Sequence, residues 1–196
     1  MQKETKLLEL TNIAAKQASA SLTKLSGEKV TVEVTKSEIT KVKAVYPDIA
    51  PEAIVAGIYL PVTGDIQGAS LLIFPEKVAY AICDLLVKRE SGTTHKLNEL
   101  DKSALMEVGN ILCGNFLTVL SNALKIKIVE NVPCFSLDMY GAIMEQIVAQ
   151  FANSAEEALV VEVKFHFEYA DIKGYIVLIF GFEHMAALVK TLKDNE

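Results

Sequence analysis

The chain has 196 residues, of which 51% are hydrophobic and 22% charged, and its 19 Lys and Arg against 25 Asp and Glu give a formal net charge of -6. Arg89 is the only arginine, which excludes an arginine clamp for phosphate, and the acidic balance disfavours nucleic-acid binding. Apolar runs are shorter than the ~18 residues of a membrane-spanning helix, and residues 1–10 lack a secretory signal's apolar core. We therefore expect a cytoplasmic protein without membrane insertion.

The first half of the chain begins with a long helical pattern followed by a strand at 29–34. Two further strands are predicted at 53–62 and 69–74, and an amphipathic helix at 75–88 follows directly after the second of them. The segment Ser-Gly-Thr-Thr at 91–94 connects the halves and is too short to be a free linker.

The second half repeats this order with one addition. A long helix at 100–124 leads into a strand at 125–132, and an extra short helix is predicted within 138–153. The half then ends with two strands and a helix, at 158–169, 175–180 and 182–192. The strands carry both alternating and continuous apolar stretches, which is typical of a sheet covered by helices.

Two short segments occur once in each half. Asp-Ile-Gln-Gly at 65–68 recurs as Asp-Ile-Lys-Gly at 171–174, in each case before an apolar strand. Glu-x-x-Asn-Ile at 9–13 recurs at 107–111, in each case within a long helix. Such self-similarity indicates an internal repeat.

The repeat predicts the fold class. We expect one α/β domain spanning 1–196, internally duplicated with pseudo-twofold symmetry, with halves at about 1–92 and 93–196. We expect a largely antiparallel sheet and two long helices that carry the Glu-x-x-Asn motif.

Neither the cysteines nor the histidines have the spacing of metal ligands. Cys83, Cys113 and Cys134 stand in apolar surroundings and are predicted to be buried, reduced thiols. Cys83 and Arg89 match the Cys-x5-Arg spacing of cysteine phosphatases, but the intervening residues lack glycine and continue a helix, so no phosphate-binding loop is expected there. His166 is predicted to be a packed or surface histidine.

The helix at 100–124 has two opposite faces when its residues are placed at ~100° per step. The apolar face collects Leu105, Leu112, Phe116, Val119 and Ala123. The opposite face, here called the polar stripe, collects Ser103, Glu107, Asn110 and Gly114. The stripe has no Lys-Glu pairs of the kind that solvated helices carry. Because glycine inside a helix costs about 0.5–1 kcal/mol relative to alanine, Gly114 predicts that another group approaches the backbone closely.

These residues form a recognisable motif. Ser103, Glu107 and Asn110, together with Pro133, give the pattern Ser-x3-Glu-x2-Asn-x22-Pro. This pattern resembles the signature of the CheC/CheX/FliY family of bacterial chemotaxis phosphatases, which dephosphorylate the response regulator CheY. The resemblance covers nearly the whole chain and implies a CheC-like domain with hydrolase activity on an aspartyl phosphate.

The resemblance also implies roles for the site residues. Asn110 is expected to orient the attacking water, since a carboxamide both donates and accepts hydrogen bonds, and Glu107 is expected to dock a lysine of the regulator. Ser103 is either a supporting contact or a solvated helix serine, and Pro133 is expected to fix the end of a strand. The resemblance further implies that the chain needs no cofactor of its own, since Mg²⁺ and a lysine are expected on the regulator.

The first half carries a second, weaker copy of the site. Glu9 and Asn12 remain, and Thr5 takes the place of the motif's Asp or Ser. Lys16 stands in the position of Gly114, where its charge would meet the regulator's lysine and metal ion. Two further departures are Thr11 in place of Gly109 and Thr35 in place of the proline. We therefore predict that the second site carries most of the activity.

A second class of function stays open on the sequence. The chain would then be a non-catalytic regulatory module that binds phosphorylated receiver domains or a CheD-like deamidase, since CheC-like proteins are known to bind CheD. The internal duplication favours a monomer, whereas a paired edge strand would favour a dimer.

Overall fold

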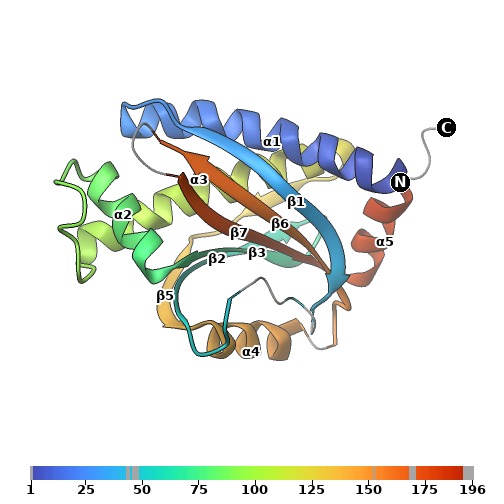
Figure 1. The fold of residues 1–196 in the computed structure, drawn as a ribbon. Helices are drawn as coiled ribbons and strands as arrows, with labels where there is room; N and C mark the ends of the chain where they lie inside the picture. Colours follow the sequence, from blue (N-terminus) through green and yellow to red (C-terminus); the bar gives the residue numbers. More distant parts are fainter. Residues whose placement is uncertain (1, 43–44, 46–48, 152, 168–170, 192–196) are drawn as a thin grey trace.

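The computed structural model describes residues 2–42, 45, 49–151, 153–167 and 171–191. It contains five helices and seven strands (Figure 1). The elements of the first half are α1 (Gln2–Ser26), β1 (Thr31–Lys41), β2 (Ile54–Gly64), β3 (Gly68–Pro75) and α2 (Glu76–Leu86). Those of the second half are α3 (Glu99–Leu124), β4 (Ile128–Glu130), β5 (Cys134–Met139), α4 (Tyr140–Phe151), β6 (Glu157–His166), β7 (Asp171–Phe180) and α5 (Phe182–Thr191).

All seven strands belong to one antiparallel sheet in the order β1-β6-β7-β3-β2-β4. β4 and β5 both pair with the remaining edge of β2, β5 along residues 54–59 and β4 along residues 62–64. The β6–β7 pair of the second half therefore lies between β1 and the β3–β2 pair of the first half. The predicted α/β class with a largely antiparallel sheet is confirmed.

Helices cover both faces of the sheet. The larger apolar core joins one face to residues of α1, α2, α3 and α5, and a smaller core joins the other face to α4. In Figure 1, α1 and α3 lie on one side of the sheet and α4 lies on the other. The long helices are thus held against the sheet on one side only, which leaves their far sides available to solvent.

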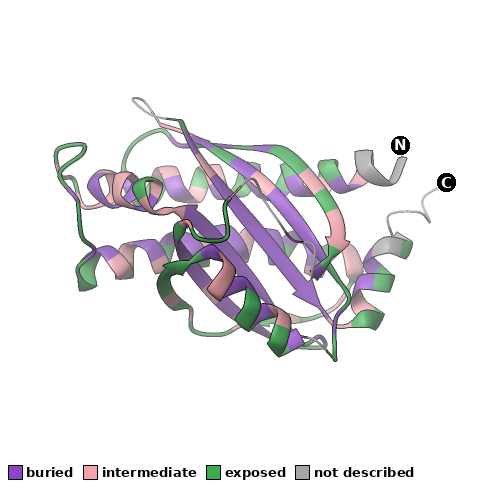
Figure 2. Ribbon diagram, turned by 60° about the horizontal axis from the view of Figure 1, so that its bottom comes forward, coloured by how far each residue is buried: buried purple, intermediate pink, exposed green. Residues whose placement is uncertain are grey.

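The covered faces explain the hydrophobic patterns of the strands. β3 and β7 lie in the middle of the sheet and are buried along most of their length, and the central strands in Figure 2 are mainly purple. The edge strand β1 instead alternates buried and exposed residues at its start. Continuous apolar sequence therefore marks central strands here, and alternation marks an edge.

The start of α3 is fixed by polar contacts. The Asn98 side chain accepts from the backbone N–H of Leu100 and Asp101, and the Asp101 carboxylate accepts from the Asn98 N–H, which makes a capping box. Arg89 donates to the fully buried Asp101 carboxylate at 2.6 Å and to Thr94. The single arginine therefore connects the segment after α2 to the beginning of α3.

The structure corrects several predicted elements. β5 was not predicted, and the strand predicted at 125–132 is reduced to the three residues of β4. Residues 131–133, which belong to no strand, separate these two short strands, and both strands pair with β2. β1 continues to Lys41, well past the predicted end at residue 34. The predicted ends at Tyr169 and Leu192 lie outside the described residues.

The length and hydropathy of α3 meet the criteria for a membrane-spanning helix. Half of the residues in the qualifying window are buried inside the fold, however, as in the core helix of a globular protein.

The burial of the cysteines agrees with the prediction at two of three positions. Cys83 and Cys113 are buried, whereas Cys134 is exposed, because it begins β5 at the edge of the sheet.

Candidate functional site

The polar stripe of α3 lies on the surface, as the sequence predicts. Ser103, Glu107 and Asn110 are all exposed, and Gly114 is partly buried. On the opposite side of the helix, four of the five predicted core residues are fully or nearly fully buried, namely Leu105, Leu112, Phe116 and Val119. Ala123 is intermediate. The carboxylate and the carboxamide therefore project from a helix whose other side is fixed in the core.

Gly109, which lies between the two motif residues, sets how closely α3 approaches the sheet. A Cβ at this position would lie 2.5 Å from Cγ2 and 3.0 Å from Cβ of Ile58 on β2. No alanine fits there unless the helix or the strand moves. The sequence marked Gly109 only as part of the motif, because its partner is distant along the chain.

Gly114 has a neighbour that the sequence did not identify. A Cβ there would lie 3.0 Å from Oε2 and 3.1 Å from Oε1 of Glu130, the last residue of β4. The predicted close approach to the helix backbone is therefore made by the chain's own carboxylate. Burial raises the pKa of the Glu130 carboxyl above its ordinary value.

The supporting residues of the second site lie at its ends. Ser103 is exposed and stands one turn before Glu107 on the same side of α3. Pro133 is partly buried and lies between β4 and β5, directly before Cys134. Its expected role in fixing the strand end stays a prediction.

The first site is presented by α1, where Glu9, Asn12 and Lys16 are exposed. Thr11, which matches Gly109 in position, is buried, and its hydroxyl donates to the Leu7 carbonyl at 2.9 Å. Thr5 lies in α1, but its side chain is outside the described part of the chain. An exposed carboxylate and carboxamide are thus present here also, with a lysine one turn further on.

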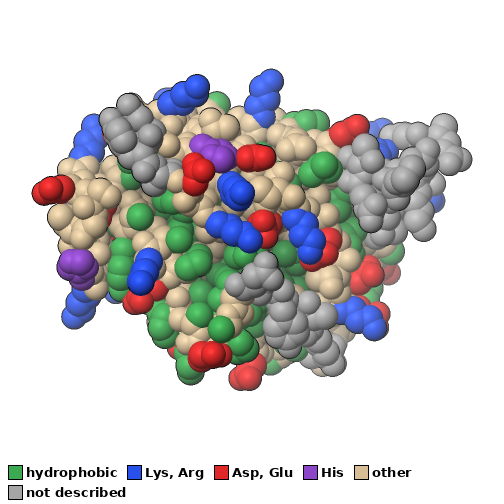
Figure 3. Space-filling view, in the orientation of Figure 1, with side chains coloured by type: hydrophobic (Ala, Val, Ile, Leu, Met, Phe, Trp, Pro, Cys, Tyr) green, Lys and Arg blue, Asp and Glu red, His purple; other side chains and the backbone are tan. Residues whose placement is uncertain are grey.

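The remaining charged groups do not build a second candidate centre. Within the described residues, no three His, Cys, Asp or Glu side chains gather as metal ligands would. Burial raises the pKa of the Cys83 and Cys113 thiols to about 12, so neither is a nucleophile at neutral pH. Lys and Arg side chains are interspersed with Asp and Glu on the face in Figure 3.

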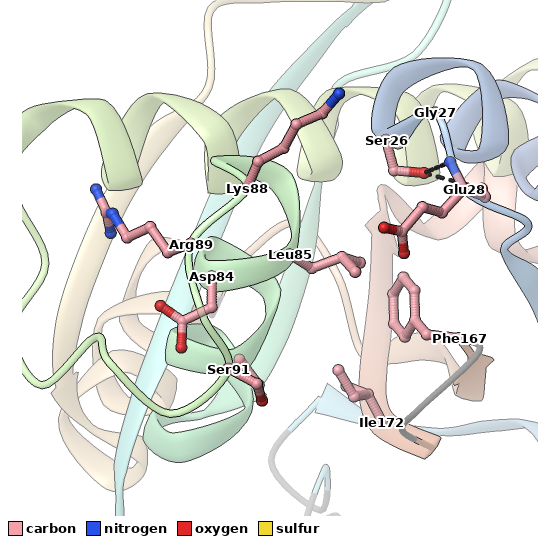
Figure 4. A pocket seen from close by; sticks show the side chains of 11 residues that line it. Ser26, Gly27, Glu28, Asp84, Leu85, Lys88, Arg89, Ser91, Phe167 and Ile172 are labelled. Atoms are coloured by element: carbon pink, nitrogen blue, oxygen red, sulfur yellow. Dashed lines mark hydrogen bonds between the residues drawn. The ribbon is translucent and has the colours of Figure 1, made fainter.

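A cavity of about 520 Å³ opens between the end of α1, the end of α2 and the β6–β7 hairpin. Figure 4 shows Glu28 and Phe167 on one side of it and Asp84 and Lys88 on the other. The Asp84 carboxylate is already hydrogen-bonded within the fold, because it accepts hydrogen bonds from the backbone N–H groups of residues 92–94. The residues that line the cavity include none of the polar stripe, so the cavity is separate from the motif residues.

Comparison with known proteins agrees with the motif. The model of the CheC-like family matches residues 100–136. The chain is 30% identical over 159 residues to the CheY-P phosphatase CheC of Bacillus subtilis (strain 168), which covers 80% of this chain and 76% of that protein.

Two solved structures share the fold. FliY of Thermotoga maritima superposes with a TM-score of 0.79 at 21% identity, covering 99% of this chain and 97% of FliY. The CheX-CheY-BeF3-Mg²⁺ complex of Borrelia burgdorferi matches with a TM-score of 0.55 at 20% identity, over 89% of this chain and 97% of the matched chain. On the strength of the sequence match to CheC and the shared fold, the chain belongs to the CheC/CheX/FliY family of chemotaxis proteins.

Proposed function

We propose that this protein is a cytoplasmic phosphoaspartate phosphatase that dephosphorylates a CheY-like response regulator in chemotaxis signalling. The observation that carries the proposal is the exposure of Glu107 and Asn110, three residues apart on one side of α3, while the other side is fixed in the core. The related CheC is named a CheY-P phosphatase, and a protein of the same fold was solved with CheY, BeF3 and Mg²⁺.

The reaction requires little covalent chemistry from the enzyme. A water oxygen forms a new bond to phosphorus, the bond between phosphorus and the aspartyl oxygen breaks, and inorganic phosphate leaves a free carboxylate. Positioning of the water and fixed electrostatics supply most of the catalysis in such phosphoryl transfers. We assign the positioning of the water to the Asn110 carboxamide, whose oxygen accepts a hydrogen bond from the water and whose NH2 group donates a hydrogen bond to the water oxygen.

Glu107 has a different task. A carboxylate would repel the phosphoryl group, but it attracts the lysine of the receiver site and so aligns the two proteins. Mg²⁺ neutralises charge on the phosphoryl oxygens when it is bound to the regulator. A CheD-like deamidase is a second candidate partner of this chain, on the resemblance to CheC-like proteins.

The two sites can be compared within one molecule. We expect E107A/N110A to lower the turnover of a phosphorylated CheY-type receiver by about 100-fold, as loss of a positioned polar group does. The matched variant E9A/N12A makes the same two substitutions on α1, and we expect it to keep turnover within about twofold of wild type, because Lys16 opposes a cationic partner. The measurement is the decay of radiolabelled phospho-receiver with catalytic amounts of protein.

Two results of the same assay would contradict the proposal. Equal losses in the two double variants would refute the assignment of activity to the second site. Decay that requires stoichiometric protein would indicate a binding module for phosphorylated receivers in place of an enzyme.

A further inference from the structure

Glu130 stands beside the motif helix, although no part of the motif includes it. Its carboxylate oxygens lie 3.0 and 3.1 Å from the position that a Cβ would take at Gly114. The carboxylate therefore occupies the space beside α3 that the absence of a side chain at Gly114 leaves open. Gly114 follows Asn110 by four residues, which is about one helical turn on the same side. The carboxylate therefore extends the polar stripe by one turn beyond Asn110.

Within the part of the chain that the structure describes, the Glu130 carboxylate has no cationic partner. It is partly buried, and it forms no ion pair or hydrogen bond with another described residue. A partner that docks on the stripe would remove more water from this charge. Because burying an unpaired carboxylate is costly, a partner fits well only if it brings a positive group to this place.

The neighbouring chain adds an apolar contact. Val132, two residues after Glu130, is 81% exposed, which is unusual for a valine. Together, Glu130 and Val132 form what we call the β4 rim. The corresponding residues of the first half are Val32 and Val34, and both are buried in β1. The first site therefore lacks such a rim, and it carries Lys16 where the second carries Gly114.

We propose that Glu130 strengthens the docking of a receiver domain on the second site, by pairing with a second cationic side chain of the receiver, distinct from the lysine that Glu107 attracts. This inference rests on the proposed function. Glu130 acts on docking and leaves the water that Asn110 orients unchanged, so its removal affects binding and KM and leaves kcat as it is.

The test measures binding and turnover separately. With a CheY-type receiver activated by beryllofluoride and Mg²⁺, we expect E130Q to weaken binding about fivefold and E130K by more, as loss or reversal of one partly buried charge pair does. Phosphatase assays should show the same rise in KM with unchanged kcat, and the difference from wild type should shrink at high salt. E145Q removes an equal charge from α4, on the other side of the sheet, and should change neither.

A second variant displaces the Glu130 carboxylate without replacing the residue. G114A displaces the flexible end of the Glu130 side chain, so it should weaken binding as E130Q does while leaving thermal stability equal or higher, since it removes a helix glycine. A folding defect is thereby separated from a docking effect.

The outcomes separate this inference from the proposed function. If wild type and E130Q bind the activated receiver equally, Glu130 is not a docking residue and the inference is wrong, whatever the turnover. If E130Q weakens binding but wild type shows no catalytic turnover, the inference stands and the phosphatase proposal fails.

Discussion

At the scale of single residues, the described structure separates the charges that hold the fold from those available to a partner. Arg89 is committed to the buried Asp101 carboxylate, and Asp84 to the connector between the halves. Glu107 and Asn110 are exposed. This division explains how an arginine-poor chain could act on a phosphoprotein, because the groups that grip phosphate would come from the substrate.

One exposed cluster predicts a pH dependence of stability. His166 lies between Glu33, 2.9 Å from Nε2, and Asp171, 2.8 Å from Nδ1, and hydrogen bonds to these two carboxylates raise its pKa above the ordinary value. Since the folded pKa is the higher one, the contribution is fully present below about pH 6.5 and is lost as the pH rises through the folded pKa.

The variant H166Q tests this dependence. We expect it to melt below wild type at pH 6, with the difference shrinking toward zero as the pH is raised to 9. H95Q, which removes an exposed histidine just after the connector, is the control for the loss of a surface histidine. A melting difference that is constant with pH would contradict the ion-pair account.

At the scale of elements, α3 combines a rigid core side with an exposed functional side. Its N-terminus is capped, its apolar residues fill the larger core, and Gly109 allows close contact with β2. A helix held in this way keeps the motif residues at fixed spacing, as positional catalysis requires.

Two glycines five residues apart on this helix should respond oppositely to the same substitution. We expect G109A to lower the free energy of unfolding by about 1–3 kcal/mol, because its Cβ would overlap Ile58, whose branched side chain cannot move aside. G114A meets only the movable end of Glu130 and should unfold no more easily than wild type. Urea unfolding measures both, and equal effects would mean that Gly109 does not set the helix-to-sheet distance.

At the scale of the whole molecule, the sheet joins the two halves. Among the described strands, β1 pairs only with β6, and β3 pairs with β7, so each half completes the sheet of the other. We propose on this basis that 1–196 is a single folding unit with two related halves at about 1–92 and 93–196.

Separate expression of the halves tests the proposal. Fragment 1–92 would expose the unpaired β1 and the open side of β3, and we expect neither fragment to unfold cooperatively as a monomer. Mixing or co-expressing them should restore the circular dichroism and the urea transition of a folded protein. A monomeric fragment with its own sharp transition would show that the halves are independent domains.

Much of this protein was readable from the sequence because the relevant signals are local. The helix period separated Leu105 and Leu112 from Glu107 and Asn110, and the motif spacing indicated the family. Repeated segments indicated the order of helices and strands. Each of these signals lies within one element or recurs along the chain, so periodicity and spacing suffice to detect it.

Other features were decided only by tertiary structure, because they join residues that are distant along the chain. β5 is only six residues long, and it was missed although Phe135, Leu137 and Met139 alternate with polar residues, because its pairing with the distant β2 is what defines it. Gly109 fits against Ile58, and Glu130 takes the space at Gly114, through contacts between α3 and the sheet. The sequence alone determined which groups α3 presents to a partner, whereas packing of α3 on the sheet decided what surrounds them.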